Sequence, residues 1–135
     1  MADGRAGRED GGAVTVTVPV RLVSEANMRE HWATKHRRKK QQQSMVKLVF
    51  VSHKVPQPPV VVAMTRIGAR KLDPDNLAGS MKHVQDAVAD ILGVDDGDEA
   101  RVRWVYQQRI GKRGEYAVEI ELKPVDTLGE ATPVR

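Results

Sequence analysis

Two aspartates separated by a single proline are the residues of this chain best suited to chemistry. They lie in the segment Lys71-Leu72-Asp73-Pro74-Asp75-Asn76-Leu77. Side chains two residues apart share a face of an extended segment, and Pro74 favours an extended conformation at Asp73. Two neighbouring carboxylates repel each other, and an oxygen-preferring divalent cation such as Mg²⁺ or Mn²⁺ relieves that repulsion. Because Pro-Asp-Asn is also ordinary turn and cap chemistry, an acidic turn without a function stays open here.

Further charged residues follow the aspartate pair along the chain. Lys82 lies on the helix that we expect to begin at Asn76, and Asp95 and Asp96 follow the end of that helix. A helix of about 16 residues carries the chain roughly 24 Å from its start. Spacing alone therefore does not show that Asp96 returns to Asp73, and a solvated acidic turn is the alternative for Asp95-Asp96.

Composition limits the class of protein. The chain has 135 residues, which fits one domain, and it has no cysteine, so disulfides and thiolate zinc sites are excluded. No apolar run approaches the roughly 20 residues that span a bilayer, and the N-terminal residues lack an apolar signal core. We expect a cytoplasmic protein with no membrane partner and no small-molecule cofactor.

Positive charge is concentrated in one part of the chain. The net charge is +4, and the basic residues are densest between Arg29 and Lys54. A dense basic stripe favours a polyanion such as nucleic acid, although a solvated helix face is the alternative. The candidate DNA contacts are Lys35, Arg37, Arg38, Lys39, Lys40, Arg70, Lys71, Lys112 and Arg113.

The pattern of apolar residues predicts the elements that must position these side chains. We expect one α/β (α+β) domain in the order β-α-β-α-β-β, a mixed sheet with helices packed on it, over residues 13–123. Disordered or frayed tails are expected at residues 1–12 and 124–135. The expected elements are a strand at Ala13–Val23, a helix at about residues 28–52, an interior strand at Val60–Arg66, a helix from Asn76 to Leu92, and strands at Arg101–Arg109 and Glu115–Leu122.

Local signals refine these elements. Pro19 places the first strand at a sheet edge or ends it early, and Gly93 is the natural stop of the second helix. The connection from Ile110 to Gly114 is typical of a hairpin turn between the last two strands. The buried face of the second helix is expected to consist of Leu77, Met81, Val84, Val88 and Ile91, with Lys82 and Asp86 pointing away from it.

The motif as a whole is more specific than its parts. It runs Arg70, Lys71, Asp73-Pro74-Asp75-Asn76-Leu77, Lys82, Asp86-Ala87-Val88 and Val94-Asp95-Asp96. This pattern resembles the RusA family of Holliday junction resolvases, well over Val60–Leu122 and loosely over Val14–Lys54. Relative to the family, the segment from Asn76 to Lys82 is longer and the gap from Asp86 to the acidic pair is shorter.

The resemblance implies a fold, a cofactor and a set of site residues. Members of the family, common in phages and prophages, are small RusA-fold homodimers that cut four-way DNA junctions with Mg²⁺. Asp73, Asp75 and Asp96 match the family's metal-binding carboxylates, Lys82 matches its active-site lysine, and Asp95 is a neighbouring ligand that assists. These four residues, Asp73, Asp75, Asp96 and Lys82, are the expected catalytic set.

The expected function is thus a Mg²⁺-dependent endodeoxyribonuclease that resolves Holliday junctions or other branched DNA by paired cuts, in recombination and repair. Two alternatives remain at this point. One is a non-catalytic recombination accessory protein that binds branched DNA. The other is a metal-dependent hydrolase of small nucleotides, which the long basic stripe disfavours because a small substrate needs no such spread of charge.

Overall fold

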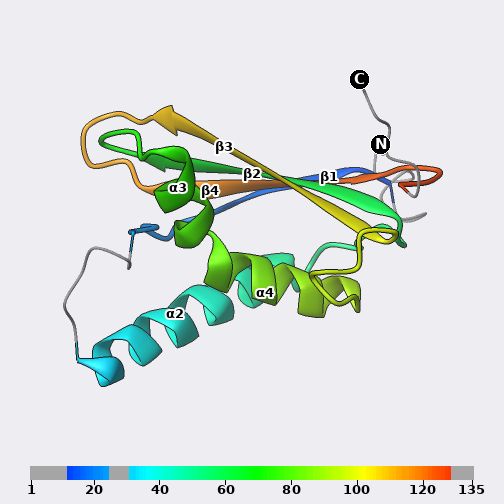
Figure 1. Cartoon of the computed structure of the whole chain (residues 1–135), viewed down its shortest axis with the longest axis horizontal. Helices are drawn as coiled ribbons and strands as arrows, with labels where there is room; N and C mark the ends of the chain where they lie inside the picture. Colours follow the sequence, from blue (N-terminus) through cyan, green and yellow to red (C-terminus); the bar gives the residue numbers. More distant parts are fainter. Residues whose placement is uncertain (1–11, 25–30, 129–135) are drawn as a thin grey trace.

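A computed structural model describes residues 12–24 and 31–128 of the chain (Figure 1). All but the last residue of the expected N-terminal tail, and the first residues of the expected first helix, lie outside the described residues. The described elements are β1 (Val14–Val18), α2 (Trp32–Phe50), β2 (Val60–Gly68), α3 (Pro74–Ser80), α4 (Lys82–Leu92), β3 (Val102–Ile110) and β4 (Ala117–Pro124).

The four strands form one mixed sheet in the order β1-β4-β2-β3. β2 and β3 are parallel and are joined by α3 and α4, whereas β4 runs antiparallel to both β1 and β2. The helices lie on one side of the sheet (Figure 1). The expected α/β (α+β) fold class, with helices on a mixed sheet, is confirmed, as are an interior β2 and an edge position for β1.

Alternation along the strands separates an apolar face from a polar one. Val16, Ile120, Met64 and Tyr106 are paired neighbours in one row across all four strands. The apolar members of such rows join Val46 and Phe50 of α2 and the buried residues of α4 in one core. The adjacent row, Thr17, Glu119, Thr65 and Gln107, belongs to the opposite face. One face of the sheet therefore carries the core and the other stays polar.

The expected helix from Asn76 to Leu92 is wrong in two respects. Its cap is Asp73, whose carboxylate accepts the Asn76 N–H, so Pro74 takes the first helical position, where a missing N–H costs nothing. The helix also breaks at Met81 into α3 and α4. The Ser80 hydroxyl donates a 2.8 Å hydrogen bond to the Leu77 carbonyl, a contact that competes with regular helix geometry.

The helical face and the helix stop are confirmed. Four of the five predicted core positions are buried, and the fifth, Ile91, packs against the core while partly exposed. Gly93 has φ +73°, the left-handed conformation that ends helices at glycine.

The predicted hairpin between the last two strands is wrong. β4 lies between β1 and β2, so the chain passes from β3 over the end of β2 before entering β4. The Gly111 N–H donates to the Gly68 carbonyl at 2.9 Å during this crossing. A Cβ on Gly111 would lie 2.7 Å from Ile67 Cγ2, so the close crossing requires glycine. The apolar strand β2 needs partners on both edges, and β3 and β4 each take one.

The remaining boundaries differ modestly from expectation. β1 stops at Val18, directly before Pro19, and the basic run does not interrupt α2. Beyond β4, Asp126 and Thr127 are exposed and Leu128 is buried, so the expected C-terminal tail contributes at least one side chain to the packed structure. Within the described ranges, no helix is both long and apolar enough to cross a membrane.

Candidate functional site

The loop that leads from β2 to Asp73 is held by hydrogen bonds to side chains of the sheet. Arg66, near the end of β2, donates from Nη1 to the Arg70 carbonyl at 2.8 Å. Gln108, its paired neighbour on β3, donates to the Leu72 carbonyl at 2.8 Å and accepts the Leu72 N–H at 2.9 Å. Both ends of the loop between β2 and Asp73 are therefore fixed to the sheet.

The Asp73 carboxylate is engaged by its own helix. Oδ1 accepts the Asn76 N–H at 2.8 Å and Oδ2 accepts the Asn76 side-chain amide at 3.0 Å. The Ser24 hydroxyl donates to Asn76 Oδ1 at 2.7 Å and so orients that amide. Asp73 and Asp75 are both solvent-exposed. Each Asp73 oxygen keeps further acceptor capacity, so capping does not exclude ligation of a cation.

A second charged group lies at α4 and the loop that follows it. Lys82 Nζ lies 3.3 Å from Asp86 Oδ1 and 3.7 Å from Asp96 Oδ2. Gln85 donates to the same Asp96 oxygen at 3.2 Å, and the Trp104 indole donates to the Asp96 carbonyl at 2.8 Å. Lys82 and Asp96, two of the four expected catalytic residues, thus lie side by side.

The pKa values of Lys82 and Tyr106 are both raised by their surroundings near Asp96. The hydrogen bond and charge of Asp86, with a further contribution from Asp96, raise the pKa of Lys82. Burial, reinforced by the charge of Asp96, raises the pKa of Tyr106, whose hydroxyl donates to Gln85. At neutral pH, Lys82 is therefore a fixed cation and Tyr106 a neutral donor.

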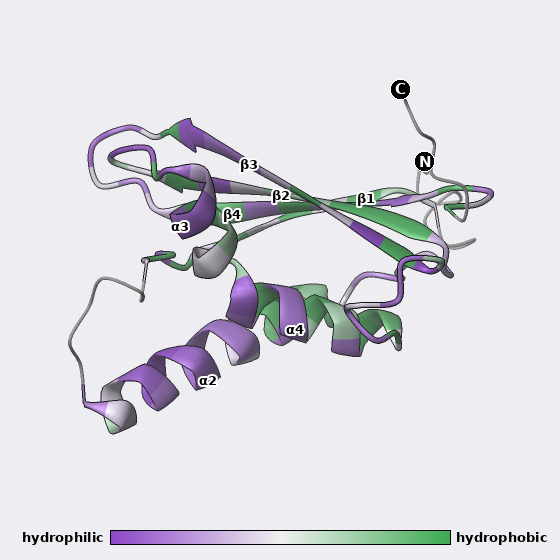
Figure 2. Cartoon of the chain, in the orientation of Figure 1, coloured by the Kyte–Doolittle hydropathy of each residue, from purple (hydrophilic) through white to green (hydrophobic). Residues whose placement is uncertain are grey.

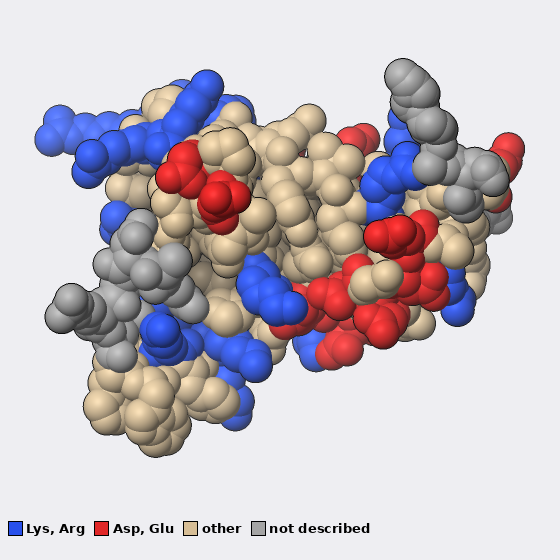
Figure 3. All heavy atoms as spheres, viewed as in Figure 1, with Lys and Arg blue, Asp and Glu red and all other residues tan. Residues whose placement is uncertain are grey.

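The two acidic groups remain apart. Across residues 12–24 and 31–128, no three His, Cys, Asp or Glu side chains form a group able to hold one metal ion. Figure 3 shows acidic side chains over α3 and a second, larger acidic group over α4 and the following loop, on the same face of the molecule. Asp95 instead accepts the Gly97 N–H at 3.0 Å and shapes a turn. Asp96 is not brought to Asp73 and Asp75.

The donor chemistry of the aspartate pair nevertheless suits Mg²⁺. This ion is commonly bound by one or two carboxylates together with waters and substrate phosphates. Only Asp73 is extended, and Asp75 lies in the first turn of α3, so the expected extended segment with both side chains on one face is wrong; both carboxylates are nevertheless exposed at the start of α3 and carry suitable donor atoms. Asp96 has the correct donor atoms, but Lys82 and Gln85 occupy one of its oxygens.

The predicted DNA contacts lie on two basic surfaces. The first, the α2 stripe, consists of Lys35, Arg37, Arg38, Lys39 and Lys40 on the hydrophilic first half of α2 (Figure 2). The second, the loop tip, consists of Arg70, Lys71, Lys112 and Arg113, which the bond from Gly111 to Gly68 brings to one end of the sheet. Figure 3 shows basic side chains beside the acidic group of α3 and further basic side chains over α2 on the same face of the molecule.

Sequence reasoning missed the residues that hold the motif in place. Arg66 continues the inward-facing series Val60, Val62 and Met64, and a charged residue in such a series is the available signal. Gln108 likewise continues the series of Trp104 and Tyr106 on β3. Their role depends on β2 pairing with β3, which the sequence did not reveal.

No protein-family model matches this chain, and no curated protein matches it. The likeness to the RusA family stays a prediction drawn from the motif residues.

Proposed function

We propose that the protein is a RusA-type endodeoxyribonuclease that cuts branched DNA, with the four-way junction as its main substrate. One observation carries the proposal: the exposed carboxylates of Asp73 and Asp75 lie at the start of α3, and Figure 3 shows acidic side chains over this helix with basic side chains beside them and further basic side chains over α2 on the same face. Basic side chains bind the phosphates of a strand, and the carboxylates beside them are suited to a cation at the scissile phosphate.

Each proposed site residue has a distinct role. Asp73 and Asp75 would hold Mg²⁺, or Mn²⁺ in its place, and Asp96 with Asp95 are the further ligands that the family likeness implies. A cation held by these carboxylates would supply a coordinated water of lowered pKa and would offset charge on the phosphate. Lys82 stays protonated because Asp86 and Asp96 raise its pKa, so it supplies positive charge to the transition state and does not act as a base.

Paired cutting requires two sites. We propose a homodimer, because a two-fold assembly matches the two-fold symmetry of a four-way junction and presents one site to each of two strands. The proposed setting is DNA recombination and repair in the cytoplasm of a bacterium or a phage-infected host.

The test is a nicking assay on synthetic four-way junctions in Mg²⁺, with linear duplex as the reference substrate. Wild type should cleave the junction, and Asp75→Asn should cut it at least about 100-fold more slowly, because a charge-stabilising group at the reacting phosphate is lost. Asp126→Asn is the matched control, since Asp126 is an exposed carboxylate beyond β4. Equal cleavage by wild type and Asp75→Asn would contradict the assignment.

A non-catalytic protein that binds branched DNA is the second candidate. The separation of Asp96 from the aspartate pair favours it, since the third carboxylate is held by Lys82 and Gln85. It predicts salt-sensitive binding of the junction with no cleavage in either Mg²⁺ or Mn²⁺. The same assay therefore separates the two candidates.

A further inference from the structure

A pocket of about 440 Å³ lies beside the loop that precedes Asp73. Its charged lining consists of Arg21, Arg66, Arg70 and Lys71, and Tyr116 completes its wall. None of its lining residues is acidic, and no acidic residue of the described ranges forms an ion pair with these four cations. The part of the chain that the structure describes supplies no counter-charge to these four cations, so they repel each other, and an anion would relieve that repulsion.

Arg66 forms the buried base of this pocket. Only 8% of the residue is exposed, and its Nε donates to the Leu22 carbonyl at 3.1 Å. With the bond to Arg70, two of its five N–H donors are used, which leaves guanidinium donors for a ligand. Burial and the nearby charge of Arg21 lower the pKa of Arg66, so its positive charge is held at an energetic cost.

Gly68 and Tyr116 help to position the two arginine guanidinium groups of the pocket, those of Arg66 and Arg21. A Cβ on Gly68 would lie 3.0 Å from Arg66 Nη2, so glycine leaves the space that the guanidinium occupies. The Arg21 guanidinium lies over the Tyr116 ring, 4.4 Å from its centroid, which orients the second arginine at the pocket wall.

We infer that this pocket binds a phosphate group, supplied by a strand of the DNA that the protein processes. Arginine guanidinium groups bind phosphate oxygens through paired N–H donors, whereas a carboxylate offers fewer oxygens to four cations. Because Arg70 and Lys71 lie three and two residues before Asp73, a strand held here continues toward the aspartate pair. The DNA source of the phosphate rests on the proposed function, while the phosphate chemistry of the pocket does not.

Binding without catalysis tests this inference. Side-chain Nε–Hε resonances of arginine are followed by NMR on the full chain in EDTA, with Arg66 and Arg21 as reporters. The probes are inorganic phosphate and a short single-stranded oligonucleotide, each compared with potassium chloride at equal ionic strength. Both probes should shift the Arg66 resonance more than chloride does.

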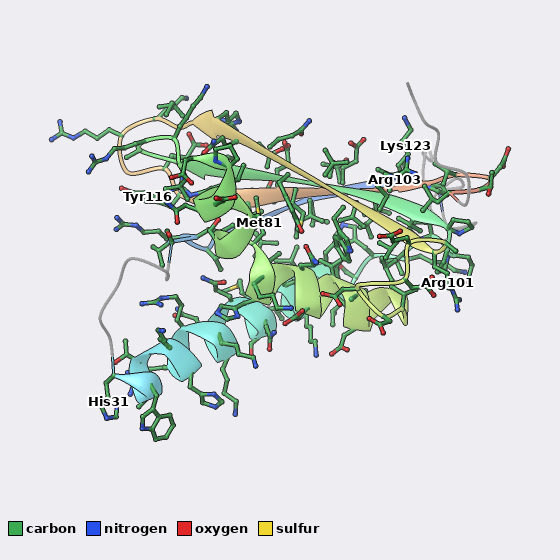
Figure 4. All side chains as sticks on the ribbon, viewed as in Figure 1. His31, Met81, Arg101, Arg103, Tyr116 and Lys123 are labelled. Atoms are coloured by element: carbon green, nitrogen blue, oxygen red, sulfur yellow. The ribbon has the colours of Figure 1, made fainter. Side chains whose placement is uncertain are left out.

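Matched variants then measure the contribution of the pocket to junction binding, again in EDTA. Arg21→Gln and Arg70→Gln should each weaken binding about tenfold, because each removes charge-assisted hydrogen bonds to a phosphate. Arg101→Gln and Lys123→Gln remove the same charge at the opposite end of the molecule from Tyr116, and should change affinity less than about twofold (Figure 4).

The outcomes separate this inference from the proposed function. If Arg21→Gln and Arg70→Gln bind the junction as the two controls do, and phosphate leaves Arg66 unshifted, the inference is overturned, and cleavage by wild type still decides the nuclease proposal. If inorganic phosphate shifts Arg66 and the oligonucleotide does not, the DNA source is overturned and a small phosphate compound is the ligand.

Discussion

The sequence singled out Asp96 and Lys82 as site residues, but it did not predict where their side chains lie relative to Asp73 and Asp75. The resemblance to the RusA family implied one site for both of them with Asp73 and Asp75, whereas spacing alone left this open. In the structure Asp96 meets Lys82 at 3.7 Å and Gln85 at 3.2 Å, but does not join the aspartate pair. Lys82 was expected to point away from the core, and its side chain is 61% exposed. Helical periodicity fixes such a direction, whereas a contact between distant segments depends on where each helix ends.

Tyr106 offers a pH test of the packing around Asp96. Burial and the charge of Asp96 raise its pKa above the ordinary 10.0. The folded state therefore holds the phenolic proton more tightly than the unfolded state, and the free energy of unfolding falls as pH rises above 10.0. The chain has two tyrosines, so Tyr116→Phe leaves Tyr106 as the one titrating phenol in an absorbance titration.

The expected tyrosinate midpoint of Tyr116→Phe lies above 10.0 in the folded protein and returns to the ordinary value in denaturant. A folded midpoint at or below the denatured one would show that Tyr106 is not buried beside Asp96 and Gln85.

Among the elements, the helices and strands were predictable and their pairing was not. Alternation in β1 and β4 and the three-and-four spacing of α4 follow from local burial, so one sequence window suffices. The β3–β4 connection has the length and glycines of a hairpin, yet it crosses β2. Whether this connection forms a hairpin or a crossing depends on which strands pair with β2, and those strands are distant from it in sequence. The break at Met81 likewise depends on how α3 and α4 each meet the core.

Two glycines of the helical region should respond to alanine in opposite directions. Gly79 lies inside α3 with open space where a Cβ would stand, so Gly79→Ala should raise the free energy of unfolding by about 0.5–1 kcal/mol. Gly93 has φ +73°, where a Cβ is strained, so Gly93→Ala should lower it by about 1–2 kcal/mol.

Urea denaturation of the two variants beside wild type measures both changes, with unchanged slopes showing that the unfolded states are comparable. If Gly79→Ala destabilises the protein as strongly as Gly93→Ala, position 79 lacks the open space for a Cβ from which its stabilisation is expected.

At the scale of the whole molecule, the separation of charge is the main feature. The α2 stripe and the loop tip are basic, and acidic side chains lie over α3 and over α4 with its following loop (Figure 3). The sequence predicted the α2 stripe as one basic run because residues 35–40 are adjacent, whereas the loop tip joins residues 70–71 to residues 112–113, which are far apart in sequence. That Lys112 and Arg113 lie at the same end of the sheet as Arg70 and Lys71 follows from the crossing of loop 111–116 over the end of β2, which the sequence did not predict.

The α2 stripe should dominate the salt dependence of DNA binding. Lys39 and Lys40 are exposed on α2, and replacing both with glutamine should reduce the slope of log affinity against log salt by up to about 0.9 for each lost phosphate contact. Fluorescence anisotropy with a labelled junction in EDTA measures the slope. The double variant Arg101→Gln/Lys123→Gln loses the same charge and should keep the wild-type slope. Equal slopes for the two double variants would show that α2 does not contact the DNA.

The position of a bound divalent cation tests the central claim most directly, because the structure offers two separate acidic groups. Crystals of the full chain grown with Mn²⁺ would be measured for anomalous scattering at the manganese edge. We predict a manganese peak at the carboxylates of Asp73 and Asp75, and its loss in Asp75→Asn. A peak held by Asp86 and Asp96 alone, or the same peak in wild type and Asp75→Asn, would contradict the assignment of the aspartate pair as the cation site of a nuclease.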